Sequence, residues 1–314
     1  MAARYSPPMP RSAVIALFGP TGVGKTDVAL ALAERLRAVG EDPVAVSADA
    51  LQVYAGLEIL TGAASAAQRA RLEHRLISFL PVTATFSAGQ YAELAHAEID
   101  TLLAGGRRPV VVGGTGLYLR AALTELSLRP APPEGVRERW LAELAQRGPE
   151  ALHAILARRA PWAAAQIAPG DRQRVVRALE LDDAGELEPG PEHSELWSDD
   201  VRHPTLLAGL TMDRERLYAR IDARVDGMLA AGAQDQVRRA ATAGASDTAR
   251  KALGFEELLA GDIEATKRRT RNYARRQLTW MRKLPGVMVL DATERGPDDL
   301  AAQIAAVWQG AFGP

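Results

Sequence analysis

The sequence predicts a three-layer α/β fold, in which helices cover both faces of a parallel sheet and an all-helical insertion interrupts the core. Short apolar runs alternate with helical periodicity over the first third of the 314 residues. Strand-like runs are missing between residues 125 and 200 and return afterwards. We therefore expect residues 1–122 and 201–314 to form the core, and residues 123–200 to form the insertion.

The core elements follow from local patterns. Buried apolar runs predict strands at residues 13–18, 43–49, 109–112, 205–213 and 286–292. Periodic apolar positions predict helices at residues 26–36, 88–104 and 298–308, and at 137–160 within the insertion. Asp213 is a suitable N-cap for a further long helix. The acidic, turn-rich segment 182–204 is expected to be a loop.

Composition excludes several kinds of site. Hydrophobic residues make up 47% and charged residues 25%, which is typical of a soluble globular protein. The absence of cysteine excludes disulfides, thiolate metal sites and cysteine nucleophiles, and the five histidines lack ligand spacing. Residues 1–12 contain no apolar run typical of a signal peptide, and no stretch is long enough to span a membrane. We expect a cytoplasmic monomer without a membrane partner.

The stretch "GPTGVGKT", residues 19–26, matches the phosphate-binding pattern G-x-x-x-x-G-K-[ST]. A buried strand precedes it and a helix follows, so backbone N–H groups and the helix N-terminus would surround an anion. Lys25 would reach terminal phosphate oxygens, and the Thr26 hydroxyl would contact Mg²⁺. The predicted phosphate-binding residues are Gly19, Pro20, Thr21, Gly22, Val23, Gly24, Lys25 and Thr26. The loop predicts a P-loop NTPase-like core and leaves the reaction open.

Two further segments are expected at the same edge of the sheet, because ligands bind at the carboxyl ends of parallel strands. Asp49, in "SADALQVY", could bind Mg²⁺ or accept a proton from a nucleophile, and could equally cap the following turn. Thr115, in "GGTGLY", offers a hydroxyl beside glycines that permit close approach of a ligand. A purely structural turn is the alternative there.

Basic residues are concentrated in residues 267–283, which hold eight Lys or Arg and no acid, with Tyr273 and Trp280 interleaved. On a helix, one face would carry Arg268, Arg271, Arg275 and Arg282. Such a stripe suits a nucleic-acid backbone, although many basic runs are simply solvated faces. A second basic segment, "DRQRVVR" at residues 171–177, lies in the expected insertion.

Together these motifs resemble the bacterial tRNA dimethylallyltransferases. The resemblance spans about residues 13–283 and rests on "GPTGVGKT", "SADALQVY", "VGGTGLYLRA", "DRQRVVRALE", "YARIDARVDGML", "KALGFEEL" and "NYARRQLTWMRK". It implies a nucleoside-kinase-like core, Mg²⁺ dependence, and an insertion that clamps the tRNA anticodon stem–loop. The implied reaction transfers a dimethylallyl group from dimethylallyl diphosphate to N6 of the adenosine 3′ to the anticodon, in tRNAs reading codons that begin with U.

The resemblance also assigns roles to residues. It implies that residues 19–26 hold the diphosphate, that Asp49 is the general base, and that Lys25, Thr26 and Thr115 complete the catalytic set. The residues that match its tRNA-contact positions are Asp49, Ala50, Leu51, Gln52, Thr115, Arg137, Gln173, Arg174, Val175, Val176, Arg177, Arg250, Lys251, Gly254, Phe255, Arg275, Arg276, Gln277, Trp280 and Arg282.

The chain departs from the family pattern at several places. Ala50 stands where the family usually has serine, and residues 74–78 read "HRLIS" in place of "HHLID". Residues 60–64 read "LTGAA" in place of "GTAKP", and the loop at 182–197 is shorter than the common form. These departures remove no main catalytic group, but they leave metal coordination open.

Three alternatives use the same loop differently. A small-molecule or nucleoside kinase would transfer the γ-phosphate of ATP, but it would leave both basic segments without a role. An isopentenyltransferase acting on free adenylate would share the chemistry but lack a tRNA-clamping insertion. A non-catalytic nucleic-acid-binding module would not need a carboxylate at the phosphate site.

Overall fold

The computed structural model describes residues 12–129, 133, 135–189 and 195–312. The chain divides into two compact units: residues 1–126 with 196–314, and residues 127–195. The expected insertion, 123–200, encloses the second unit. The signal-peptide prediction falls on residues 1–12, of which 1–11 lie outside the described residues, and the expected loop at 182–204 includes the undescribed 190–194. Within the described ranges, no helix has both the length and the apolar character needed to cross a membrane.

A six-stranded parallel sheet forms the centre of the first unit, in the order β4-β2-β6-β1-β7-β8. Its strands are β1 (Val14–Phe18), β2 (Pro43–Ala48), β4 (His74–Arg75), β6 (Arg108–Gly113), β7 (Thr205–Thr211) and β8 (Met288–Asp291). The central strand β1 pairs Ile15 with Val110 and with Leu206. Separately, β3 (Tyr54–Ala55) pairs with β5 (Leu80–Pro81). The three short strands β3, β4 and β5 were not predicted, because two residues show no periodicity.

The helices of the first unit cover the sheet and extend beyond its carboxyl edge. They are α1 (Lys25–Ala38), α2 (Glu58–Thr61), α3 (Ala66–Arg71), α4 (Ala88–Ala104), α5 (Gly116–Leu123), α9 (Arg214–Ala230), α10 (Ala233–Thr242), α11 (Phe255–Leu259), α12 (Ile263–Met281) and α13 (Pro297–Phe312), with the 3₁₀ turn η2 (Ala249–Lys251). The 3₁₀ turn η1 (Glu195–Trp197) begins at the last residue of the second unit. Asp213 caps α9 as expected, since its carboxylate accepts the N–H groups of Glu215 and Arg216.

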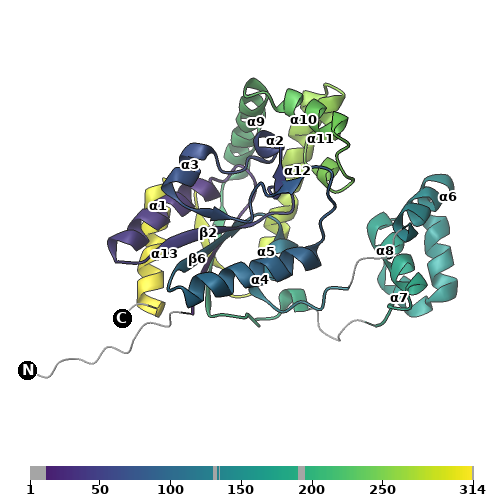
Figure 1. Cartoon of the computed structure of the whole chain (residues 1–314), viewed down its shortest axis with the longest axis horizontal. Helices are drawn as coiled ribbons and strands as arrows, with labels where there is room; N and C mark the ends of the chain where they lie inside the picture. The colour runs from purple at the N-terminus through teal and green to yellow at the C-terminus, as the bar shows by residue number, and fades with distance from the viewer. Residues whose placement is uncertain (1–11, 130–132, 134, 190–194, 313–314) are drawn as a thin grey trace, which may run out of the picture. The chain divides into compact units, whose positions relative to one another are not determined.

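The expected three-layer arrangement is confirmed. On one face, α1 and α13 lie side by side, and Ile15, Leu17 and Trp308 belong to the core between them and the sheet (Figure 1). On the other face, α4 and α5 pack together against β6, and the hydroxyl of Tyr91 donates to the carbonyl of Ser47 at 2.9 Å (Figure 1). The helices α9, α10, α11 and α12 gather near α2 (Figure 1).

In the described part of the second unit, helices are connected by loops and no strand is present. The unit contains α6 (Val136–Arg159), which kinks at Gly148, followed by α7 (Pro161–Gln166) and α8 (Arg172–Asp183). Its core includes Trp140, Leu152, Leu156 and Leu179. The side chain of Asp171 caps α8 by accepting the N–H of Arg174, so the basic segment opens a helix.

Candidate active site

The phosphate loop joins β1 to α1, as the sequence predicts. Gly24 precedes α1 with a φ of 100°, a left-handed conformation that glycine adopts at little cost. The ammonium group of Lys25 donates to the carbonyls of Gly19 and Pro20, at 2.8 and 3.0 Å. Burial, and secondarily the neighbouring charge of Arg224, lowers the pKa of Lys25 to about 8. The loop therefore holds a cation whose contacts are carbonyl dipoles rather than a carboxylate.

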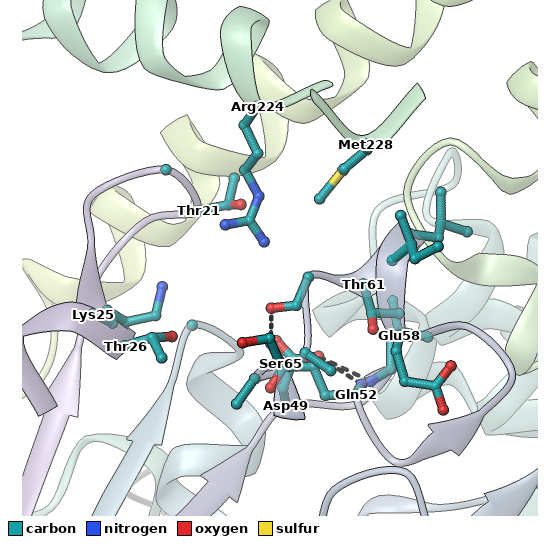
Figure 2. Close-up of a pocket in the computed structure, with 18 of the residues that line it drawn as sticks. Thr21, Lys25, Thr26, Asp49, Gln52, Glu58, Thr61, Ser65, Arg224 and Met228 are labelled. Atoms are coloured by element: carbon teal, nitrogen blue, oxygen red, sulfur yellow. Dashed lines mark hydrogen bonds between the residues drawn. The ribbon is translucent and has the colours of Figure 1, made fainter. Parts of the chain in front are cut away.

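A cavity of about 890 Å³ opens beside this loop. Its wall comes from the loop, the carboxyl ends of β2 and β6, the α2–α3 segment, and helices α9 and α12. Figure 2 shows Lys25, Thr26 and Asp49 on one side, with Arg224 reaching in from the other. The predicted residues that line the cavity are Thr21, Gly22, Gly24, Lys25, Thr26, Asp49, Leu51, Gln52 and Gln277.

Asp49 takes the capping role that the sequence left open, and its side chain also lines the cavity. Its Oδ1 accepts the backbone N–H groups of Leu51 and Gln52, at 2.9 and 3.4 Å, so the residue does cap the following turn. Within the described part of the chain, Oδ2 takes no hydrogen bond, and the side chain lines the cavity. The capping bonds fix the carboxylate at the end of β2 and leave one oxygen to act on a ligand.

Gln277 ties three parts of the site together. Its Oε1 accepts the N–H of Thr21, and its Nε2 donates to the carbonyl of Gly114 at 2.7 Å. A Cβ on Gly114 would lie 2.3 Å from that Nε2, so the glycine is needed for the approach of α12. Beside it, the hydroxyls of Thr115 and Tyr273 lie 3.1 Å apart. The "GGTGLY" turn is thus a docking point for α12 as well as an edge of the cavity.

Arg224, on α9, lines the cavity and was not among the residues predicted from the sequence. Burial lowers the pKa of its guanidinium, and it forms no hydrogen bond or ion pair with any described residue. Basic residues on an amphipathic helix usually face solvent. The available signal was its spacing: Arg224 follows the buried Leu217 and Ile221 by seven and three positions, which is the inward face of the helix.

The other predicted RNA contacts in the first unit differ in their exposure. Arg275, Arg276 and Arg282 are exposed on or just after α12. Phe255 is fully buried, and Trp280 packs against Gly116 and stacks on Trp197 with ring centroids 4.7 Å apart. The remaining predicted contacts in this unit are Ala50, Arg250, Lys251 and Gly254.

The basic stripe of α12 is less free than its composition indicates. Acidic side chains of other helices neutralise part of it: Arg271 pairs with Asp222 at 2.6 Å, and Lys267 pairs with Asp226 at 2.7 Å. Both acids lie on α9. Of the four arginines predicted on one face, Arg271 is therefore engaged within the protein.

The second unit holds the predicted contacts Arg137, Gln173, Arg174, Val175, Val176 and Arg177. Both valines are buried in the core of the unit, whereas the side chain of Arg174 is 72% exposed. Arg137 and Arg177 both bind the fully buried carboxylate of Glu180, at 2.9 and 3.1 Å. Glu180 was not among the residues predicted from the sequence. Its carboxylate binds both Arg137 of α6 and Arg177 of α8.

A model of the IPP transferase family matches residues 52–284 of the chain. The chain belongs to this family. A family relative from Kineococcus radiotolerans, a tRNA dimethylallyltransferase, is 42% identical over 94% of this chain and 96% of its own length. A second tRNA dimethylallyltransferase, from Thermobifida fusca, is 44% identical over 88% of this chain and 89% of its own.

Solved structures of the family give the same fold. The tRNA isopentenylpyrophosphate transferase of Bacillus halodurans matches with a TM-score of 0.69 and 31% identity, covering 96% of this chain and 97% of that one. A eukaryotic dimethylallyltransferase acting on tRNA matches with a TM-score of 0.74 and 25% identity, covering 96% and 79%. The sequence-based resemblance and the predicted α/β fold are both confirmed.

Proposed function

We propose that this IPP transferase family member transfers the dimethylallyl group of dimethylallyl diphosphate to N6 of the adenosine 3′ to the anticodon, in tRNAs reading codons that begin with U. The observation that carries the proposal is the cavity in which the carboxylate of Asp49 lies with two partly buried cations, Lys25 and Arg224. The cations that could bind an anion thus lie in the same cavity as a carboxylate that could act as a general base. The names of the family's curated relatives support the same reaction.

Asp49 would act on the acceptor. The N6 amine of adenine is a poor nucleophile, because its lone pair is delocalised into the ring. Oδ2 of Asp49, unengaged among the described residues, would accept the N6 proton as the bond from N6 to C1 of the donor forms. The C1–O bond breaks in the same process, and its electron pair leaves with the diphosphate.

The phosphate loop, Lys25 and Arg224 would stabilise the departing diphosphate. Negative charge grows on the bridging oxygen as the allylic cation develops, and donors already in place lower that barrier without reorganising. Lys25 would exchange its carbonyl contacts for phosphate oxygens, and Arg224 would gain the anionic partner that it lacks within the described chain. The loop would therefore retain a leaving group rather than pass on a phosphoryl group.

The residues present fit the proposed Mg²⁺. Among the described residues, no group of three His, Asp or Glu side chains could hold a metal unaided. Mg²⁺, however, commonly keeps several waters and is held by one or two protein oxygens together with substrate phosphates. The Thr26 hydroxyl, which lines the cavity, suits that arrangement. When bound, the ion would neutralise charge on the diphosphate.

The basic helical surfaces would hold the RNA. The target base must leave its stack to reach Asp49, at a cost of a few kcal/mol, on the order seen for base flipping. Exposed arginines such as Arg174 and Arg275 would offset that cost through backbone phosphates. This requirement separates the proposal from its rivals, since neither a kinase nor a free-adenylate isopentenyltransferase needs an RNA-binding unit.

One assay tests the proposal. The protein is incubated with labelled dimethylallyl diphosphate, Mg²⁺ and an anticodon stem–loop carrying adenosine 3′ to the anticodon. We expect label on that RNA and none on a matched stem–loop with guanosine there. Label on AMP but not on RNA would identify a free-adenylate isopentenyltransferase. ATP-dependent phosphorylation of a metabolite, without prenyl transfer, would identify a kinase.

A further inference from the structure

Gly62 ends helix α2 at the wall of the cavity, in a left-handed conformation with a φ of 60°. The space where its side chain would be is occupied. A Cβ built on Gly62 would lie 1.6 Å from Nη2 and 2.7 Å from Cζ of Arg224, and 3.3 Å from Cε of Met228. The guanidinium therefore passes through the volume that any other residue at this position would fill.

The described structure gives that guanidinium no direct polar contact, although the charges of Asp49 and Asp27 act on it. Arg224 lacks an ion pair or hydrogen bond to the described residues, and its pKa is lowered by burial. A partly buried side chain without direct polar contacts takes its position largely from the shape of the surrounding wall. At this wall the decisive feature is the missing side chain of Gly62.

The departure of this segment from the family pattern agrees with that geometry. Where "GTAKP" places an alanine followed by a lysine, this chain has Gly62 followed by Ala63. The segment thus lacks both a methyl group and a cation, and the cation of Arg224 lies over the position of the lost methyl group. The missing methyl group thus leaves room for the guanidinium.

We propose that Gly62 is a positioning residue, whose missing side chain admits the guanidinium of Arg224 to the cavity opposite Lys25, so that a diphosphate is held from both sides. This inference rests on the proposed function for the identity of the anion. Gly62 itself contacts no reacting atom. Its effect passes entirely through Arg224.

The test compares two glycine variants. Gly62→Ala adds a methyl group against the mobile end of Arg224, which must move away, whereas the backbone has no such clash. Gly56→Ala is the matched control: Gly56 also has a positive φ, of 88°, but its Cβ would meet only Val82 Cγ1, at 3.8 Å. Both variants carry the same kind of backbone strain, so a loss confined to Gly62→Ala reports on Arg224.

Binding of inorganic diphosphate, with Mg²⁺, is measured by calorimetry. We expect Gly62→Ala to raise the Kd about tenfold, since a charge-assisted contact is weakened, and Gly56→Ala to leave it unchanged. The KM for dimethylallyl diphosphate should rise in parallel. Equal Kd values for wild type and Gly62→Ala, or equal losses in both glycine variants, would overturn the proposal.

A double-mutant cycle completes the test. If Gly62 acts through Arg224, then Gly62→Ala should add no further loss to Arg224→Ala, and additive losses would contradict the proposal. Diphosphate binding does not require prenyl transfer. A protein that binds diphosphate as expected but labels no RNA would therefore refute the proposed function while leaving the role of Gly62 intact.

Discussion

The backbone N–H of Thr21 donates a hydrogen bond of 2.8 Å to Oε1 of Gln277, a residue 256 positions later in the chain. The same side chain donates through Nε2 to Gly114 at the end of β6. One buried amide thus joins the phosphate loop, the neighbouring strand end and helix α12. The helix that carries the basic stripe is thereby coupled to the loop that would hold the diphosphate.

Gln277→Glu should raise the Kd of diphosphate. In free energy, this loss of binding should exceed the loss in the free energy of unfolding. A carboxylate can still accept from Thr21, but it cannot donate to Gly114, and it adds negative charge beside the anion site. We expect about a tenfold or greater increase in the Kd of diphosphate. Gln277→Met, which loses both hydrogen bonds without adding charge, serves as the control for lost structure. An equal effect of the two variants on diphosphate binding would contradict the charge argument.

Asp49→Asn should abolish turnover while preserving both the turn and RNA binding. The Asn Oδ1 can keep the capping bonds to Leu51 and Gln52, whereas the amide cannot accept the N6 proton. We expect a loss of about 10²–10⁴ in kcat, with RNA affinity within a few-fold of wild type. Asp49→Ala should lose turnover to the same extent and also about 1 kcal/mol of stability, because its hydrogen bonds to the turn are lost. Near-normal turnover in either variant would exclude Asp49 as the base.

Lys25 should destabilise the unliganded protein in a pH-dependent way. Its pKa in the folded protein is about 8, below the value of about 10.4 for an unfolded chain. Between these values the unfolded state binds more protons, so this group makes the free energy of unfolding rise with pH. Below both values, burying the charged amine costs at most about 3 kcal/mol.

Lys25→Met should therefore be more stable than wild type at about pH 7, and the difference should shrink as the pH rises past the folded pKa of about 8. Urea unfolding of both proteins at pH 7 and at about pH 9.5 measures this change. Added diphosphate should stabilise wild type and not the variant, because the anion compensates the buried cation. A wild type that is more stable than the variant without ligand would refute the argument.

Local patterns predicted the features that depend on neighbouring residues. The glycine spacing of the phosphate loop, Asp49 at a strand end and the cap at Asp213 are each visible within a few positions. The structure added the relationships that depend on packing between distant segments. Three contacts between distant elements are examples: Arg224 with Gly62, Gln277 with Thr21, and Asp222 with Arg271. No local pattern encodes how such elements pack against each other. Composition alone also overestimated how many basic side chains of α12 are unpaired, because their acidic partners lie on another helix.

The helical unit offers a test that separates RNA binding from stability. Arg174 is exposed, and its acidic neighbour Asp171 lies 3.5 Å away on the surface, so Arg174→Ala should cost little stability. Arg177 lies on the same helix but also binds the buried carboxylate of Glu180 and the carbonyl of Arg129. Removing it leaves Glu180 with fewer donors, and we expect a loss of about 1–3 kcal/mol in stability.

Both substitutions should weaken binding of the anticodon stem–loop, because each removes a cation from the surface proposed to face phosphates. If each arginine contacts one phosphate, the slope of log K against log salt should become shallower by about 1 for either variant. Titrations at several salt concentrations, with thermal unfolding measured in parallel, give both quantities. Of the two variants, only Arg177→Ala should unfold at a lower temperature than wild type. The reason is that Arg177 compensates the buried charge of Glu180, whereas Arg174 does not. An RNA affinity that does not respond to salt would show that phosphate contacts do not hold the RNA, and the proposed clamp would then be wrong even if prenyl transfer occurs.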